Sequence, residues 1–241
     1  MRLETPCEVS QKQITFDVEE IEPILQGVPM DIAPWPGATI QLKDGRSLYI
    51  REAKIEEAPM MMEYIMKVMQ AKNDFYDVVG ARVYAELAGW YRKRLKDPYV
   101  LVGIVDGQLA GFANGRLMSK EINISLHTMA LMRGLRVGAI MYYAKAYYGF
   151  EILGNEEWWA TYESYNGWKR WGVGMAQPSY PWPEYQHELG GARVYYVTKK
   201  YWDVSIKKYV QQMVGADLVF DVPDEIVKAN EVMRLPDEVM V

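Results

Sequence analysis

Two long apolar runs meet at Asp106-Gly107, and this junction constrains the fold of the 241-residue chain more than any other feature. Residues 99–105 are continuously apolar, and residues 109–117 form the run that returns. An Asp-Gly pair readily adopts the left-handed torsions of a two-residue hairpin turn. The two runs are therefore predicted to be antiparallel strands in the middle of a sheet.

The elements around this hairpin can be read from their periodicity. A strand is predicted over residues 47–52, and helices over residues 60–69 and 82–95. After the hairpin come a strand (121–129), a helix (138–148), a strand (157–163), a short helical piece from Asn166 and a strand (192–198). Antiparallel strands that lead into one βαβ crossover predict an α+β (mixed α/β) fold rather than a doubly wound parallel sheet.

The chain divides into three parts by composition. Residues 1–46 are predicted to be an N-terminal arm, because they hold Pro6, Pro23, Pro29, Pro34 and Pro36 and only a short helix signal at 18–25. Residues 47–202 form the main domain. Residues 203–241 are predicted to be a helical tail, with helices over 204–214 and 224–233.

Charge and cysteine content exclude several classes of protein. A net charge of −5 argues against a nucleic-acid binder, which usually has a basic face. Cys7 is the one cysteine, so an internal disulfide or a four-ligand zinc site is excluded, and no metal is expected. The N-terminus carries no secretory leader, and no apolar stretch is long enough to span a membrane, so we expect a cytoplasmic protein.

Residues 131–139 join the strand at 121–129 to the following helix and suit a phosphate group. The first turn of a helix has N–H groups without partners and a partial positive charge, and Gly134 and Gly138 let an anion approach the backbone. Arg133 and Arg136 add full charges. The alternative is an ordinary helix start with two surface arginines.

Several segments resemble the GNAT superfamily of N-acetyltransferases, in the order of that family. Residues 49–53 resemble its opening strand, and residues 105–113 its central hairpin. Residues 133–139 are similar to its coenzyme A loop, written R/Q-x-x-G-x-G/A, and Asn166 and Gly174 match later positions. The resemblance covers residues 47–202. The sequence departs from the pattern at Arg136, where the family has glycine, at Met175, where it has Phe, and at Arg170, where it often has the Tyr that protonates the leaving thiolate.

The resemblance implies a mostly antiparallel sheet of six to seven strands with about four flanking helices. It also implies acyl-CoA as cosubstrate, bound where the strand at 121–129 splays from the next one. The residues expected to bind the coenzyme are Thr128, Met129, Ala130, Arg133, Gly134, Leu135, Arg136, Val137, Gly138, Ala139 and Asn166.

Three side chains are candidates for proton transfer. Strand alternation places Glu121, Asn123, Ser125 and His127 on one face, so Glu121 and His127 are candidate bases, unless that face is simply a polar one turned to solvent. Glu163 follows the next strand and is a third candidate, with an ordinary turn residue as the alternative.

The sequence leaves three functions open. The first is an acyl-CoA-dependent N-acyltransferase that moves an acetyl group to a primary amine of a small molecule or amino acid. The second is a catalytically silent module that binds coenzyme A or a protein partner. The third is an assembly protein whose arm and tail clasp a second subunit as a homodimer. Aromatic residues between 142 and 202 are read either as core or as an acceptor pocket, with residues 178–183 as its rim.

Overall fold

The computed structural model describes residues 29–71, 76–175, 177–179 and 194–238. Cys7, the helix predicted over 18–25 and most of the predicted rim lie outside the described residues.

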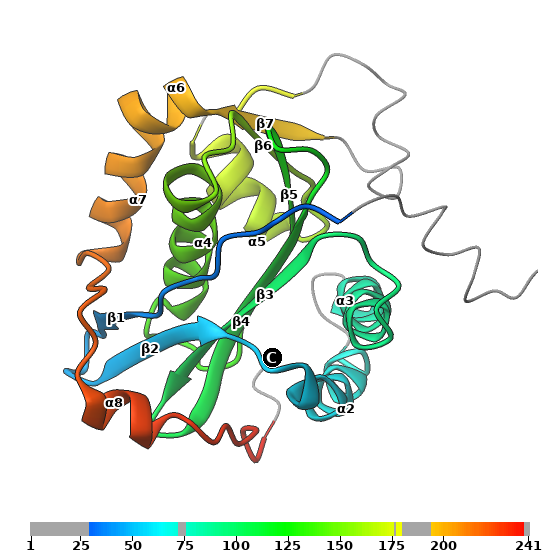
Figure 1. Ribbon diagram of the computed structural model, residues 1–241, viewed down its shortest axis with the longest axis vertical. Helices are drawn as coiled ribbons and strands as arrows, with labels where there is room; N and C mark the ends of the chain where they lie inside the picture. Colours follow the sequence, from blue (N-terminus) through cyan, green and yellow to red (C-terminus); the bar gives the residue numbers. More distant parts are fainter. Residues whose placement is uncertain (1–28, 72–75, 176, 180–193, 239–241) are drawn as a thin grey trace, which may run out of the picture.

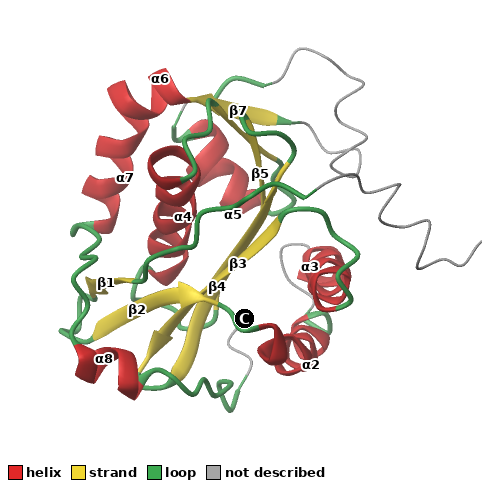
Figure 2. Ribbon diagram, in the orientation of Figure 1, coloured by secondary structure: helices red, strands yellow, loops and turns green. Residues whose placement is uncertain are grey.

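A seven-stranded sheet runs through the molecule with its strands in sequence order, β1-β2-β3-β4-β5-β6-β7 (Figure 2). Every neighbouring pair is antiparallel except β5 and β6, which are parallel. The strands are β1 (Ala38–Gln41), β2 (Ser47–Glu52), β3 (Pro98–Val105), β4 (Gln108–Leu117), β5 (Ile122–Ala130), β6 (Glu157–Ala160) and β7 (Tyr195–Thr198). The expected mostly antiparallel α+β fold is confirmed.

Helices cover both faces of this sheet. The α-helices of the described residues are α2 (Ala58–Val68), α3 (Tyr76–Tyr91), α4 (Val137–Tyr147), α5 (Tyr165–Gly167), α6 (Lys199–Tyr201), α7 (Lys207–Val214) and α8 (Asp224–Ala229). Helices α4, α5 and α6 each continue into a π-helical segment, at Tyr148–Ile152, Trp168–Val173 and Trp202–Ile206. No helix of the described residues has the length and apolar character needed to cross a membrane.

Figure 1 shows α4 and α7 on one side of the sheet and α2 and α3 on the other, and two hydrophobic clusters fill the space between helices and sheet. On one face, α4 and α7 bury residues such as Tyr143 and Val210. On the other, α2 and α3 bury residues such as Met61 and Leu87. Helix α4 is the crossover between β5 and β6, and parallel neighbours require such a connection.

The hairpin predicted at Asp106-Gly107 is confirmed. Asp106 and Gly107 have φ of 51° and 76°, the left-handed torsions of a two-residue hairpin turn. The tail contacts this turn, because the Gly107 N–H donates to Asn230 Oδ1 at 3.0 Å and the Arg234 N–H donates to the Gly107 carbonyl at 2.8 Å.

Both segments outside the predicted main domain contact it. Strand β1 lies in the predicted arm and pairs with β2, and it was not foreseen because four residues carry little pattern. In the predicted tail, Val219 pairs with Thr39 of β1, and α7 packs on α4. The strand predicted over 157–163 ends at Ala160, and the helix predicted from residue 82 already includes Tyr76.

Candidate functional site

Strands β5 and β6 part in the middle of the sheet. Their pairing runs from Ile122 with Glu157 to Ser125 with Ala160, whereas β5 continues to Ala130. Among the described residues, the last five of β5 therefore have no partner on the β6 side, and Thr128, Met129 and Ala130 pair with β4 alone. A cavity of about 600 Å³ opens at this point.

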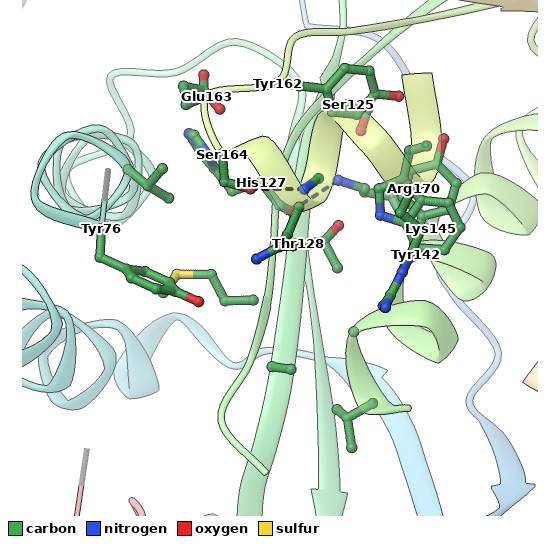
Figure 3. A pocket seen from close by; sticks show the side chains of 18 of the residues that line it. Tyr76, Ser125, His127, Thr128, Tyr142, Lys145, Tyr162, Glu163, Ser164 and Arg170 are labelled. Atoms are coloured by element: carbon green, nitrogen blue, oxygen red, sulfur yellow. Dashed lines mark hydrogen bonds between the residues drawn. The ribbon is translucent and has the colours of Figure 1, made fainter. Parts of the chain in front are cut away.

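The cavity is lined by β5, the loop before α4, α4 itself, α3 and the segment after β6 (Figure 3). Its lining residues are Tyr76, Val79, Ser125, Leu126, His127, Thr128, Met129, Ala130, Met132, Arg133, Gly134, Arg136, Val137, Gly138, Tyr142, Lys145, Thr161, Tyr162, Glu163, Ser164, Asn166, Gly167, Arg170 and Trp171. We call the part formed by residues 133–138 the loop end. We call the part around His127, Thr128 and Lys145 the strand end.

A β-bulge in β5 shapes the strand end. Ala113 pairs with Thr128 and Gly115 with Ser125, so three steps along β5 face two along β4. Asn114 lies opposite the extra residue and accepts the His127 N–H on its side-chain oxygen at 3.0 Å. Because side chains alternate between the two faces of a strand, one extra residue turns every later side chain of β5 to the opposite face.

The prediction that His127 shares a face of β5 with Asn123 and Ser125 is therefore wrong. Asn123 accepts a hydrogen bond at 2.8 Å from Tyr99, which packs in the core beneath α4. His127 instead turns toward α3, on the opposite side of the sheet, where its Nε2 lies 3.0 Å from Glu86 Oε1.

His127, which lines the cavity, pairs with the partly buried Glu86 behind it. The His127 side chain is 6% exposed, and the second carboxylate oxygen of Glu86 accepts a hydrogen bond from Asn114 Nδ2 at 2.6 Å. A carboxylate in this position fixes the ring and stabilises the imidazolium that forms when the ring takes up a proton. Glu86 carried no sequence signal, because it lies 41 residues from His127 and on a different element.

The two other predicted proton carriers lie in different settings. Glu163 lines the cavity and is paired, since it accepts hydrogen bonds from Arg82 at 2.6 Å and from Thr161 at 3.2 Å. Glu121 lies outside both β5 and the cavity, in the exposed turn before the strand. The Ser119 hydroxyl donates to Glu121 at 2.7 Å and lowers the pKa of that carboxyl. Glu121 is therefore no partner of His127.

Lys145 comes from α4 and is buried beneath the bulge. Its Nζ donates to the His127 carbonyl at 2.9 Å and to the Asn114 carbonyl at 3.2 Å. Burial lowers the pKa of the amine to about 7, an effect that the carboxylates of Glu86 and Glu163 oppose. The role of Lys145 was not predicted. The sequence did hold a signal for it, because Lys145 is a lone charged residue among the apolar and aromatic residues of this helix.

The first turn of α4 opens into the loop end of the cavity. No side chain caps the helix at Arg136, so its first N–H groups are available to a ligand. A Cβ built at Gly134 meets nothing within 4 Å, and one at Gly138 meets only the Ala130 Cβ at 3.5 Å. An anion can therefore come close to the backbone at the start of α4.

The two arginines of the loop have different partners. Arg133 donates to the Tyr76 hydroxyl at 2.9 Å and lies over that ring. Arg136 adopts left-handed torsions (φ 63°, ψ 18°), and its guanidinium donates to the Met213 carbonyl at 2.7 Å and the Val214 carbonyl at 3.3 Å. Its charge was expected to grip a phosphate, but it is held at the C-terminal end of α7, where carbonyl groups attract cations.

The remaining residues predicted to bind a coenzyme fall into two groups. Thr128, Met129, Ala130, Val137 and Asn166 line the cavity. Leu135 and Ala139 do not line it, because Leu135 packs partly buried on the core and Ala139 is 2% exposed within it. Thr128 Oγ1 is buried and has no hydrogen-bond partner among the described residues.

Aromatic rings close the strand end. Tyr142 stacks on Trp171 with ring centres 3.9 Å apart and planes within 4°. The Tyr162 hydroxyl donates to Gln177 at 2.7 Å, and the Gln177 side-chain amide donates to Tyr142 at 3.0 Å. Burial raises the pKa of both phenols, so they stay protonated. Part of the predicted aromatic load therefore lines the cavity, while rings such as Trp202 lie in the core.

No protein-family model matches the chain, and no curated protein matches its sequence. Solved structures do match its fold. RimJ of Mycobacterium smegmatis, solved in complex with CoA-disulfide, is 12% identical with a TM-score of 0.51, over 76% of this chain and 97% of RimJ. Apo FdhC, described as a nucleotide-linked sugar GNAT, is 8% identical with a TM-score of 0.50, over 76% of this chain and 98% of FdhC. At these identities the likeness establishes a shared fold.

Proposed function

We propose, from the GNAT fold of this chain, that it transfers an acyl group from acyl-CoA to an amine. The observation that carries the proposal is one continuous cavity, which joins the open first turn of α4 to the gap between β5 and β6. A ligand with a diphosphate at one end and a reactive thioester at the other matches both ends of that cavity.

The loop end would hold the diphosphate. The first N–H groups of α4 point into the cavity with the positive end of the helix dipole, and Gly134 and Gly138 leave the space. The arm of the coenzyme would follow residues 128–130 of β5, whose backbone groups are available on the side without a neighbouring strand. The RimJ complex with CoA-disulfide supports a coenzyme in a fold of this kind.

The strand end would carry out the transfer. An amine attacks only as the neutral species, so His127 would take its proton, and Glu86, 3.0 Å from the ring, would stabilise the imidazolium. Backbone N–H groups of β5 would polarise the thioester carbonyl as charge develops on its oxygen.

The acceptor is proposed to be the primary amine of a small molecule or amino acid, and the acyl group to be acetyl. A cavity of about 600 Å³ is in the range that small ligands occupy. The stacked pair of Tyr142 and Trp171 offers an apolar wall, which suits an acceptor with an apolar or aromatic portion.

Two assays test the proposal. Thermal unfolding with and without coenzyme A should show stabilisation of about 2.7 kcal/mol when the ligand is present at 100 times its dissociation constant. Release of free thiol from acetyl-CoA should then depend on a member of a panel of amines. Stabilisation without thiol release from any amine would identify a binding module. The absence of any stabilisation by coenzyme A would contradict the proposal.

A further inference from the structure

Lys145 is a buried amine that lines the cavity, and the acyl transfer described above does not use it. We propose that the Lys145 ammonium is the proton donor to the sulfur of coenzyme A as the thioester breaks. This inference rests on the proposed acyl transfer and names a further catalytic residue for it.

The length of the coenzyme brings its sulfur to the level of Lys145. Lys145 lies eight residues beyond Val137, the first residue of α4, a rise of roughly 12 Å along the helix. The arm between the diphosphate and the sulfur has about as many main-chain atoms as four extended residues, which reach roughly 13 to 14 Å. A diphosphate at the start of α4 thus places the sulfur opposite Lys145.

The contact of Lys145 with β5 supports the same position of the sulfur along α4. Helix α4 runs back along β5, and the Lys145 Nζ reaches the carbonyl of His127, just before the backbone groups proposed to hold the arm. The sulfur is therefore expected just beyond Ser125, the last residue of β5 that pairs with β6, where the gap between the two strands begins.

The bonding of Lys145 leaves one position for a ligand. An ammonium has three N–H donors. Two of them meet the carbonyls of His127 and Asn114, and no third acceptor lies within hydrogen-bond distance in the described part of the chain. The Trp158 ring lies 6.0 Å from the Nζ, and Lys145 lines the cavity, so we assign the third N–H to a group inside the cavity.

The other protonated groups at the strand end are less suited to this step. Tyr142 and Tyr162 are held through Gln177, and burial raises the pKa of both phenols, which makes them weak donors. His127 faces Glu86 and α3, on the opposite side of the sheet from α4. Arg170 lines the cavity, but a guanidinium does not give up its proton at neutral pH.

The acidity of Lys145 suits a thiolate acceptor. Burial lowers the pKa of its amine to about 7, against the raising effect of Glu86 on α3 and Glu163 after β6. An acid with a pKa near the working pH is an efficient donor, and a thiolate that forms beside the ammonium stabilises the protonated form of the lysine. The ring of Trp158 on β6 lies 6.0 Å from the Lys145 Nζ and is uncharged.

The step is balanced without any further reactant. The amine nitrogen forms a bond to the acyl carbon, and the carbon–sulfur bond breaks with its electron pair on sulfur. The Lys145 proton moves to that sulfur and gives the free thiol. His127 takes up the proton lost by the acceptor amine and releases it to solvent, and the Lys145 amine takes up one proton from solvent, so the net products are an amide and coenzyme A.

The experiment measures the acidity of the thiol in bound coenzyme A. The wild-type protein is saturated with coenzyme A, and the ultraviolet absorbance of the thiolate is followed against pH. The same protein with desulfo-coenzyme A supplies the background. We expect the pKa of the bound thiol to lie about one unit or more below that of the free coenzyme, because the thiolate and the Lys145 ammonium stabilise each other and titrate as a coupled pair.

Three variants sharpen the result. In Lys145→Met, an apolar side chain of similar size, the thiol pKa should return to that of free coenzyme A or higher. In Lys145→Arg, the charge is kept and the low thiol pKa with it, but turnover should fall because the guanidinium does not donate its proton. In Lys169→Met, the matched change at an exposed lysine outside the cavity, the thiol should titrate as in wild type.

Two results would overturn the role of Lys145 and leave the proposed function untouched. One is a wild-type thiol that titrates like free coenzyme A although thermal unfolding shows that the coenzyme is bound. The other is an equally low thiol pKa in Lys145→Met. The wild-type measurement decides even if that variant fails to fold. Absence of coenzyme binding would overturn the proposed function together with this inference.

Discussion

The loop end of the cavity is formed by backbone groups, whereas the strand end is formed by side chains. The loop end consists of the backbone of a few consecutive residues, and Gly134 and Gly138 keep it open. The strand end depends on side chains from four elements: His127 of β5 and Lys145 of α4 line the cavity, and Asn114 of β4 and Glu86 of α3 hold them in place from behind. Changes at one end should therefore alter coenzyme binding, and changes at the other should alter the chemistry.

The largest expected effect is at the strand end. His127→Ala should lower kcat about a thousandfold, because it removes the group proposed to accept the amine proton. Glu86→Gln should lower kcat less, because the ring stays in place but loses its carboxylate. Coenzyme affinity, measured by calorimetry, should change less than about twofold in both.

The control for these variants is Glu121→Gln, in the exposed turn outside the cavity. It should leave kcat unchanged. A loss of coenzyme affinity in His127→Ala equal to its loss of kcat would erase the distinction between the two ends.

The next effect belongs to the loop end. Gly138→Asp should weaken coenzyme A binding at least about a hundredfold, because a carboxylate would meet the diphosphate at the helix start. Gly138→Ala is the matched variant, since its Cβ meets only the Ala130 Cβ at 3.5 Å, and it should lose far less affinity. Equal affinities of wild type and Gly138→Asp would show that the coenzyme binds elsewhere.

A third effect concerns stability at the strand end. The pKa of Lys145 is lowered to about 7 in the folded protein, from 10.5, so between these values the unfolded chain binds more protons. Stability must then rise with pH in this window, by about 2 kcal/mol between pH 7 and pH 9. Urea unfolding at both pH values measures the gain.

Lys145→Met removes this titration, and its stability should rise less over the same interval. Identical pH dependence in the two proteins would mean that Lys145 keeps an ordinary pKa, and would also weaken its assignment as proton donor.

The smallest effect tests the left-handed backbone at Arg136. Both Arg136→Gly and Arg136→Ala lose the hydrogen bonds to Met213 and Val214, but only alanine is strained at a φ of 63°. Arg136→Gly should therefore be more stable than Arg136→Ala by about 1 kcal/mol in urea unfolding. Equal stabilities would contradict the left-handed torsions.

The same contrast explains what the sequence could predict. The loop end was found because its signals are consecutive: a strand pattern, two glycines, two arginines and a helix pattern within residues 121–148. The side-chain direction of Arg136 was not predictable, because its partners on α7 lie 77 and 78 residues away.

The strand end was only partly predicted. His127 was identified, but the other candidate base, Glu121, lies in a turn, and the residue that pairs with His127, Glu86, is distant in sequence. One extra residue in β5 decides this outcome, because it turns His127 away from the face that it would share with Asn123. Period-two patterns do not reveal a bulge, so the fold could be predicted much further than the geometry of the site.

The unpaired half of β5 has a consequence for the protein without its ligand. Residues 126–130 form an edge inside the fold, where a neighbouring strand would normally satisfy the peptide groups. An amide-bearing arm laid along this edge acts as a surrogate strand and completes the ladder. Occupancy should therefore be readable as slower hydrogen exchange at Thr128 and Ala130, with the ligand serving as a missing piece of secondary structure.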